Sequence, residues 1–265
     1  MQKLASCFLT LLLTVGTLLP SAAFGVTATP TLDRLKKAGK LVVAIDATYP
    51  PMESEDAKGQ PVGFDIDFAR ELAKRLGLKA EFQVMGWDGI LAGLNSKRFD
   101  VIISTMNITP ERQKQVAFVE YAKLSQLFIA RKGTKVTSDK DLAGKVVAVQ
   151  ADTTSYDYVE SRRKAGVKIS DVKAFRLATD AFTALQANQA DVLVVDEPVG
   201  KYYAKQNPSL FVITGRAMAP EPIGVAMRKD EADLTKSVQQ AVDAMKKDGS
   251  VKKMQVTWFG SVLGV

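Results

Sequence analysis

Two parts of this chain repeat the same order of features, and this repetition constrains the fold more than any other property of the sequence. GKLVVAID at Gly39 to Asp46 and GKVVAVQ at Gly144 to Gln150 each place Gly-Lys before a short apolar run. LNSKRFDVIIST at Leu94 to Thr105 and LQANQADVLVVD at Leu185 to Asp196 share a helix end, an aspartate and another apolar run. Such runs are typical of strands buried on both faces. The sequence therefore predicts an α/β protein of two similar βαβ lobes, each a mostly parallel sheet flanked by helices.

The residue types that are rare in this chain exclude most familiar catalytic chemistry. The sequence has no histidine and a single cysteine, Cys7, in its first 25 residues. A mature protein without that segment has no disulfide, thiol nucleophile, Ser-His-Asp triad or common zinc site. We therefore predict no catalytic residue, no metal and no cofactor. The formal net charge is +7, but the basic residues are scattered, so we expect no nucleic-acid partner.

Residues 1–25 have the composition of a secretion signal. Lys3 is the only charged side chain there, the run LTLLLTVGTLLP forms an apolar core, and Ser21-Ala22-Ala23 supplies small residues for cleavage. The apolar core is too short for a membrane span. We expect a signal peptide and a secreted mature chain.

Polar and aromatic residues follow the strands of the first half. Asp46 ends the strand predicted for Lys40 to Ile45, and the loop ATYPPM at Ala47 to Met52 is stiffened by two prolines that hold Tyr49 in extended geometry. Ser104 and Thr105 end the apolar run that begins at Val101. Because open α/β sheets bind ligands beyond the carboxyl ends of their strands, these residues indicate a binding cleft.

Arg112 lies in the first turn of a helix that begins with a clear capping signal. Thr109 is the expected N-cap and Pro110 the first helical residue. A cation at this position opposes the helix dipole unless an anion binds there. Two interpretations remain open from the spacing: Arg112 binds a ligand carboxylate, or it pairs with a surface acid.

The second half offers a complementary set of polar groups. Asp152-Thr153-Thr154-Ser155 supplies N-caps for a helix that runs to about Ala165, and its free N–H groups and hydroxyls suit an anion. Asp191 is expected to cap its strand start or to form a salt bridge there, as Asp100 would in the first half. Asp196 leaves the strand Val192 to Val195, where a buried carboxylate needs a partner such as a ligand ammonium, with Glu197 as its solvated neighbour.

The patterns also predict local details. Asp65 is the expected N-cap of a helix that ends near Leu76, and alternation over Lys79 to Met85 places Val84 toward the core. The helix that contains Arg112 is expected to run to about Ala117. Ala122 to Ala130 reads as a strand that crosses between the lobes.

Together these residues resemble the periplasmic amino-acid-binding proteins of ABC importers, the polar amino-acid or family 3 type of solute-binding protein. The motifs that carry the resemblance are GFDIDFARELAKRLG at Gly63 to Gly77 and DVIISTMNITPERQKQVAF at Asp100 to Phe118. The family fold implies two lobes joined by two crossing segments, here near Ala122 to Gln126 and Arg216 to Pro222. Residues 26–123 and 219–265 would then form lobe 1, and residues 124–218 lobe 2.

The resemblance also implies roles for residues at the carboxylate end of a ligand. Arg112 is similar to the residue that clamps the α-carboxylate, and Thr105 and Thr154 resemble the donors that assist it. Thr153 and Thr154 agree with the family pattern. Asp152 departs from it, because a glycine is usual at that position.

For the rest of the ligand, the resemblance implies that Asp196 receives the α-ammonium, with Ser104 and Asn107 nearby. The residues implied to surround the ligand side chain are Asp46, Tyr49 and Trp87.

The expected function is therefore the binding of a free amino acid by a periplasmic monomer, which delivers it to the membrane subunits of an ABC importer. Asp46 and the two aromatic residues slightly favour a cationic or polar side chain, so arginine, lysine, ornithine, histidine and glutamine all remain open. The alternative is a cyclohexadienyl or arogenate dehydratase on the same fold, with Asp152, Asp196 or Glu197 as general acid. A receptor-coupled sensor would use the same site.

Overall fold

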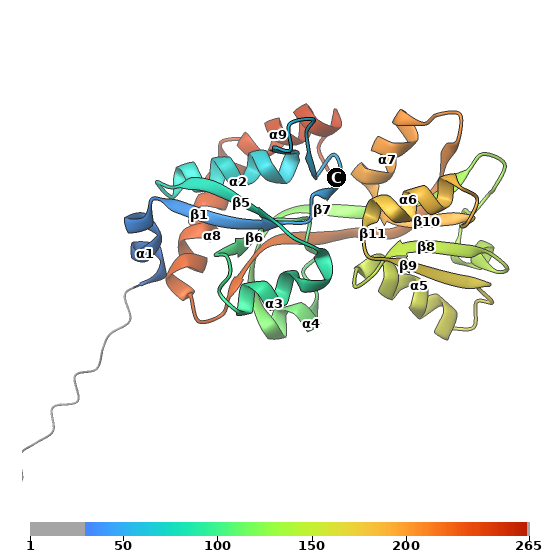
Figure 1. The fold of residues 1–265 in the computed structure, drawn as a ribbon, viewed down its shortest axis with the longest axis horizontal. Helices are drawn as coiled ribbons and strands as arrows, with labels where there is room; N and C mark the ends of the chain where they lie inside the picture. Colours follow the sequence, from blue (N-terminus) through green and yellow to red (C-terminus); the bar gives the residue numbers. More distant parts are fainter. Residues whose placement is uncertain (1–29, 264–265) are drawn as a thin grey trace, which may run out of the picture.

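The computed structural model describes residues 30–263 and has two lobes side by side (Figure 1). The predicted signal peptide lies outside the described residues. Within residues 30–263 no helix is both long enough and apolar enough to cross a membrane.

Helices and strands alternate along both lobes. The elements of the first part are α1 (Thr31–Ala38), β1 (Lys40–Ile45), β2 (Thr48–Tyr49), β3 (Glu53–Glu55), β4 (Pro61–Val62), α2 (Phe64–Arg75), β5 (Lys79–Val84), η1 (Trp87–Gly89), α3 (Ile90–Asn95), β6 (Val101–Ile102), α4 (Pro110–Gln115) and β7 (Val116–Arg131). Those of the second part are η2 (Asp139–Leu142), β8 (Val146–Gln150), α5 (Thr154–Lys164), β9 (Asp171–Phe175), α6 (Ala178–Gln186), β10 (Val192–Asp196), α7 (Glu197–Gln206), β11 (Phe211–Arg228), α8 (Ala232–Lys247) and α9 (Ser250–Phe259).

The strands form one eight-stranded sheet in the order β5-β1-β6-β11-β7-β10-β8-β9. β5, β1 and β6 pair in parallel in one lobe, and β10, β8 and β9 do so in the other. The long antiparallel pair of β7 and β11 lies between these two groups. α2, α8 and α9 cover one face of the first lobe and α3 the other (Figure 1). The predicted α/β class is confirmed, with the difference that two shared strands join the lobes into a single sheet.

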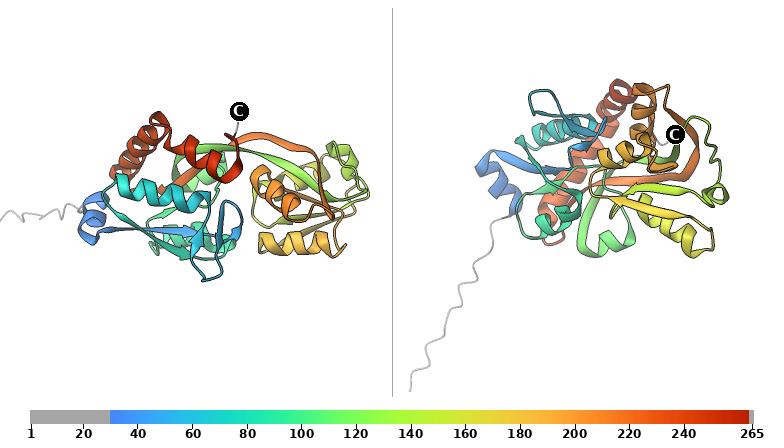
Figure 2. Two further views of the ribbon diagram at one scale, coloured as in Figure 1. Left: turned by 90° about the horizontal axis from the view of Figure 1, so that it is seen from above. Right: turned by 45° about the vertical axis from the view of Figure 1, so that its right-hand side comes forward.

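β7 and β11 run side by side from one lobe into the other (Figure 2). The predicted crossing strand is therefore real but longer than expected, since β7 begins at Val116 and the preceding helix ends at Gln115, before Ala117. The register of the pair shifts between Arg216 and Met218 and again between Met218 and Glu221. These irregularities fall in a segment where the sequence predicts a crossing, and the lobe boundaries near 123/124 and 218/219 remain a prediction.

Two predictions about side chains are wrong. Asp65 does not cap α2, because Gly63 is the N-cap and the Asp65 carboxylate is fully buried in hydrogen bonds to Thr105 and Tyr121. Val84 is 46% exposed instead of lying in the core, since β5 is the edge strand and Val84 is its last residue.

The same hydrogen-bond pattern occurs at one strand start in each lobe. It shows that Asp100 and Asp191 cap these strands, one of the two roles expected for them. Asp100 Oδ2 accepts a hydrogen bond from Val42 N–H at 2.9 Å, and Asp191 Oδ2 accepts one from Val146 N–H at 2.8 Å. In each case the aspartate N–H also donates to the carbonyl of the same valine. Each aspartate thus sets the register of its strand against the neighbouring one, which aligns the strand ends that face the cleft.

Gly63 lets the three-stranded antiparallel sheet of β2, β3 and β4 pack directly against the start of α2. Its φ is +138°, and a Cβ at this position would lie 2.1 Å from the carbonyl oxygen of Met52. That carbonyl accepts a hydrogen bond from Asp65 N–H at 2.9 Å, so the contact also places Glu53 near Asp65.

We expect Gly63→Ala to destabilise the protein by roughly 3 kcal/mol or more, because the new methyl meets backbone atoms and the positive φ is strained. Urea unfolding measures the change. Gly59→Ala is the matched control, since its φ is also positive but open space surrounds its Cβ position. A loss in Gly63→Ala no larger than that in Gly59→Ala would contradict the packing argument.

Candidate functional site

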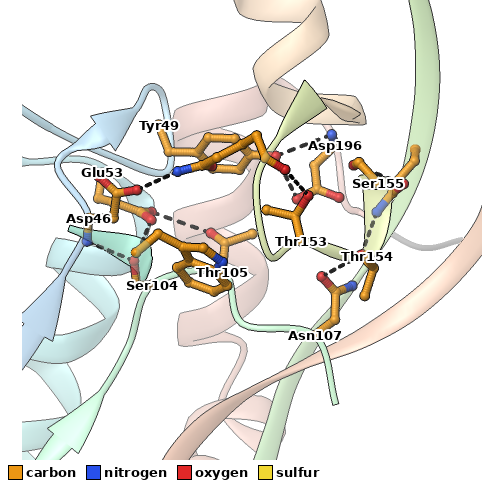
Figure 3. Close-up of a pocket in the computed structure, with 13 residues that line it drawn as sticks. Asp46, Tyr49, Glu53, Ser104, Thr105, Asn107, Thr153, Thr154, Ser155 and Asp196 are labelled. Atoms are coloured by element: carbon orange, nitrogen blue, oxygen red, sulfur yellow. Dashed lines mark hydrogen bonds between the residues drawn. The ribbon is translucent and has the colours of Figure 1, made fainter. Parts of the chain in front are cut away.

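A pocket with about 350 Å³ of empty volume lies where the strand ends of the two lobes face each other (Figure 3). Its lining residues are Asp46, Tyr49, Glu53, Trp87, Ser104, Thr105, Asn107, Gln126, Gln150, Thr153, Thr154, Ser155 and Asp196. Nine of the ten residues predicted as ligand-binding are in this lining, and Arg112 is the exception.

Asp196 and Asn107 each present one buried polar atom without a partner. Asp196 ends β10 and is 4% exposed; its Oδ2 accepts a hydrogen bond from the Tyr49 hydroxyl at 2.9 Å. Its Oδ1 is buried and accepts no hydrogen bond from any residue in 30–263. Asn107 Oδ1 accepts from the Thr154 hydroxyl at 3.1 Å, which leaves Asn107 Nδ2 without an acceptor in the same region. Buried polar groups normally find partners, so an acceptor and a donor are available to a ligand in one pocket.

Burial controls the ionisation of Asp196. It raises the pKa of this carboxyl to about 7, and the charge of Glu221 acts in the same direction. The Tyr49 hydrogen bond, the nearby side-chain amide of Gln126 and the charge of Arg112 lower the pKa but do not compensate. An ammonium ion at Oδ1 would favour the ionised form, because an opposite charge lowers the pKa of a buried acid.

Arg112 lies between the lobes at the edge of the pocket. Thr109 Oγ1 accepts a hydrogen bond from Arg112 N–H, which confirms the predicted cap. The guanidinium donates through Nη1 to the Asn107 carbonyl and through Nη2 to the Asp152 carbonyl, both at 3.1 Å. It also stacks over the Trp87 ring at 5.3 Å from the centroid. No surface acid within residues 30–263 forms an ion pair with Arg112. The structure therefore contradicts the interpretation that Arg112 pairs with a surface acid.

Asp152 has a φ of +59°, which explains why a glycine suits this position. Its carbonyl accepts from both Trp87 Nε1, at 2.9 Å, and Arg112 Nη2. Two side chains of the first lobe therefore meet one backbone atom of the second. The exposed Asp152 carboxylate lies outside the pocket lining.

The other end of the pocket is held by Asp46. Its Oδ2 accepts from Gln150 Nε2 at 2.7 Å across the lobes, and its Oδ1 accepts from the Thr48 hydroxyl at 2.9 Å. Burial raises the pKa of Asp46, while these hydrogen bonds lower it. Asp46 directly follows β1 and Gln150 is the last residue of β8, so the internal repeat held a signal for Gln150 that sequence reasoning did not use.

Thr105 lines the pocket but uses both of its donors elsewhere. Its N–H donates to Asp65 Oδ2 at 2.6 Å, and its hydroxyl donates to the same atom at 2.9 Å. The expected donation from Thr105 to a ligand carboxylate does not fit this geometry, because Asp65 accepts the hydrogen bonds of both the Thr105 N–H and the Thr105 hydroxyl.

Four lining residues were missed: Glu53, Gln126, Gln150 and Ser155. Ser155 belongs to the predicted capping segment, and Gln126 is a polar residue inside the apolar run of β7, so both had a weak local signal. Glu53 had no local sequence signal, because only the packing of the β2–β4 sheet against α2 brings it into the pocket lining.

The family model for bacterial extracellular solute-binding proteins, family 3, matches residues 41–261. The chain belongs to this family. The solute-binding protein is 33% identical over 234 residues to the L-cystine-binding protein TcyJ of Escherichia coli K12, covering 87% of this chain and 86% of the relative. It is 34% identical over 231 residues to the lysine/arginine/ornithine-binding periplasmic protein of the same strain, with 82% and 86% covered. An ancestral arginine-binding protein bound to arginine matches with a TM-score of 0.80 and 40% identity, over 84% of this chain and 99% of that one.

The acids named for the alternative enzyme are not gathered in the solute-binding protein. Glu197 pairs with Lys201 at 2.5 Å on α7 and does not line the pocket, and neither does Asp152. Asp196 alone of the three does. Within the described part of the chain, no group of three or more His, Cys, Asp or Glu side chains could hold a metal ion.

Proposed function

We propose that this solute-binding protein binds a free amino acid as a zwitterion between its lobes and delivers it to the membrane subunits of an ABC importer in the periplasm. The unpaired Asp196 Oδ1 and Asn107 Nδ2 support this function best, because they match the ammonium and carboxylate of one ligand. Arg112 lies next to Asn107, and a ligand carboxylate that displaced its carbonyl contacts would receive a charged, two-pronged donor.

The charge of the pocket favours a cationic ligand side chain. The lining contains three acids, Asp46, Glu53 and Asp196, and no lysine or arginine. Tyr49 and Trp87 add aromatic faces. Charge-assisted hydrogen bonds contribute about 1.5–3 kcal/mol each. Several of them leave about −8 kcal/mol after ordering costs, which is a micromolar dissociation constant.

A thermal-shift screen with arginine, lysine, ornithine, histidine and glutamine tests the proposal. A ligand at 100 times its dissociation constant stabilises the folded state by about 2.7 kcal/mol, which raises the Tm by about 5 °C or more. Agmatine and 5-guanidinovalerate are the matched controls, since each lacks one end of the arginine zwitterion. Equal shifts with agmatine and arginine, or no shift with any amino acid, would contradict zwitterion binding.

One observation favours the dehydratase as a second candidate: burial holds Asp196 near the pKa that a general acid needs at neutral pH. Incubation with prephenate and with arogenate, followed by product analysis, separates the two functions. We expect no turnover. Turnover lost in Asp196→Asn would instead support the enzyme.

A further inference from the structure

Glu53 and Asp65 form a buried acid pair directly beside the pocket. Glu53 is 1% exposed and Asp65 is 0% exposed, and only Glu53 belongs to the pocket lining (Figure 3). The Ser104 hydroxyl donates to Glu53 Oε1 at 2.8 Å, and the Tyr121 hydroxyl donates to Asp65 Oδ1 at 2.8 Å. In each acid, therefore, one carboxylate oxygen accepts a hydrogen bond from a hydroxyl group that the other acid does not use.

The remaining two oxygens share the hydroxyl of Thr105. Thr105 Oγ1 lies 2.9 Å from Asp65 Oδ2 and 3.3 Å from Glu53 Oε2. A hydroxyl has one proton, so it cannot donate to both. If Glu53 Oε2 carries a proton, that proton is donated to Thr105 Oγ1, and the hydroxyl donates in turn to Asp65. This arrangement satisfies every oxygen, whereas two ionised acids would leave one buried carboxylate oxygen facing a lone pair.

The surroundings of the pair do not supply a compensating cation. The titratable groups that face it are Asp46 at the end of β1, Tyr49 on β2 and Tyr121 on β7. None of the ion pairs within residues 30–263 includes Glu53 or Asp65. Arg112 on α4 directs its guanidinium to the carbonyls of Asn107 and Asp152. Burial, with the charge of Asp65 added to it, raises the pKa of the Glu53 carboxyl well above its ordinary value.

We propose that Glu53 holds a proton shared with Asp65 and releases it to solvent when a cationic ligand side chain enters the pocket, so that Glu53 decides the response of the site to ligand charge. The inference rests on the proposed amino-acid binding and deepens it. The O–H bond of Glu53 breaks, the proton goes to the buffer, and the pair changes from one negative charge to two as the ligand adds one positive charge. A neutral side chain leaves the proton in place. One pocket can thus accept both kinds of ligand at the same net charge.

Arginine and citrulline test this inference, because they share the α-groups and nearly the same shape but differ in side-chain charge. Calorimetry in two buffers of different ionisation enthalpy counts the protons released on binding. We expect arginine to release up to one proton more than citrulline. The ratio of their affinities should then rise with pH by up to tenfold per unit. Proton release from Asp196 is common to both ligands and cancels.

Glu53→Gln is expected to remove the extra proton and to flatten the pH dependence of the affinity ratio. Glu55→Gln, in the same strand but exposed, is the matched control and should behave as the unmodified protein. Infrared difference spectra of ligand-free protein against Glu53→Gln should show the carbonyl band of a protonated carboxyl group.

Binding of both ligands with equal proton release, or no such carbonyl band, would overturn the proton proposal alone. Failure of both ligands and of every other amino acid to bind would overturn the proposed function, and the proton proposal with it.

Discussion

Asp196→Asn is expected to weaken amino-acid binding by about 3–5 kcal/mol, because it removes the charge that we propose faces a ligand ammonium at Oδ1. The same change should make the ligand-free protein more stable at neutral pH. The carboxyl of Asp196 is almost fully buried and, among residues 30–263, has a hydrogen-bond donor only at Oδ2, so its ionisation opposes folding. An asparagine avoids that cost while its carbonyl still accepts from Tyr49.

The pH dependence of this stability effect has a definite sign. The pKa of Asp196 is about 7 in the folded protein and 3.8 as the ordinary value. The folded state therefore binds more protons between these pH values, and the group lowers stability as the pH rises from about 4 to 7. We expect Asp196→Asn to gain on the order of 4 kcal/mol above pH 7 and nothing below about pH 4.

Calorimetric titration and thermal unfolding over this pH range measure both effects. Glu197→Gln is the matched control, since Glu197 is the adjacent acid, pairs with Lys201 and lies outside the pocket lining. Its binding should match the unmodified protein. An unchanged dissociation constant in Asp196→Asn would show that the ammonium binds elsewhere.

Arg112→Ala is expected to reduce amino-acid affinity at least 100-fold, about 3 kcal/mol, and to leave the fold intact. A guanidinium donates two parallel hydrogen bonds to a carboxylate, each stronger than a neutral one. Removing the side chain also removes one contact between the lobes, the Nη2 bond to the Asp152 carbonyl, and the stacking on Trp87, which donates to the same carbonyl. Because Arg112 is only half-buried, the unfolding free energy should change by about 1 kcal/mol or less.

Arg112→Lys separates charge from geometry, since lysine keeps the charge but not the planar fork, and we expect intermediate affinity. Arg163→Ala serves as a control, because Arg163 is exposed on α5 and pairs with Glu160, away from the pocket lining. Circular dichroism checks the fold. Near-native affinity in Arg112→Ala would contradict the carboxylate role.

The lining of the candidate pocket was largely predictable because several of its residues lie at the ends of strands. Asp46, Ser104 and Asp196 each end an apolar run, and the Thr109-Pro110 cap marks the turn that carries Arg112. Parallel strands place their carboxyl ends at one edge, so these residues converge in any fold of this class. Glu53 could not be found in this way, because it lies in the middle strand of the small β2–β4 sheet, whose position depends on the contact between Met52 and α2.

The roles of several residues were less predictable than their positions. Asp65 has the sequence context of an N-cap, yet its carboxylate turns inward to Thr105 and Tyr121. The Asp65 carboxylate oxygens could accept hydrogen bonds either from the first turn of α2 or from Thr105 and Tyr121. Only the tertiary packing of α2 against β7 decides which donors they meet. The start of β7 at Val116 was missed for a related reason, since pairing with β11 extends a strand beyond its own apolar run.

The sequence by itself determined the repeated βαβ construction, the strand ends and the caps, because these follow from hydrophobic period and from hydrogen bonds between near neighbours. The tertiary structure alone decided that Gln150 meets Asp46, that Tyr49 meets Asp196 and that Glu53 shares a hydroxyl with Asp65. Those contacts join residues far apart in the chain. They exist only once two lobes face each other and α2 has packed, and no local pattern encodes that arrangement.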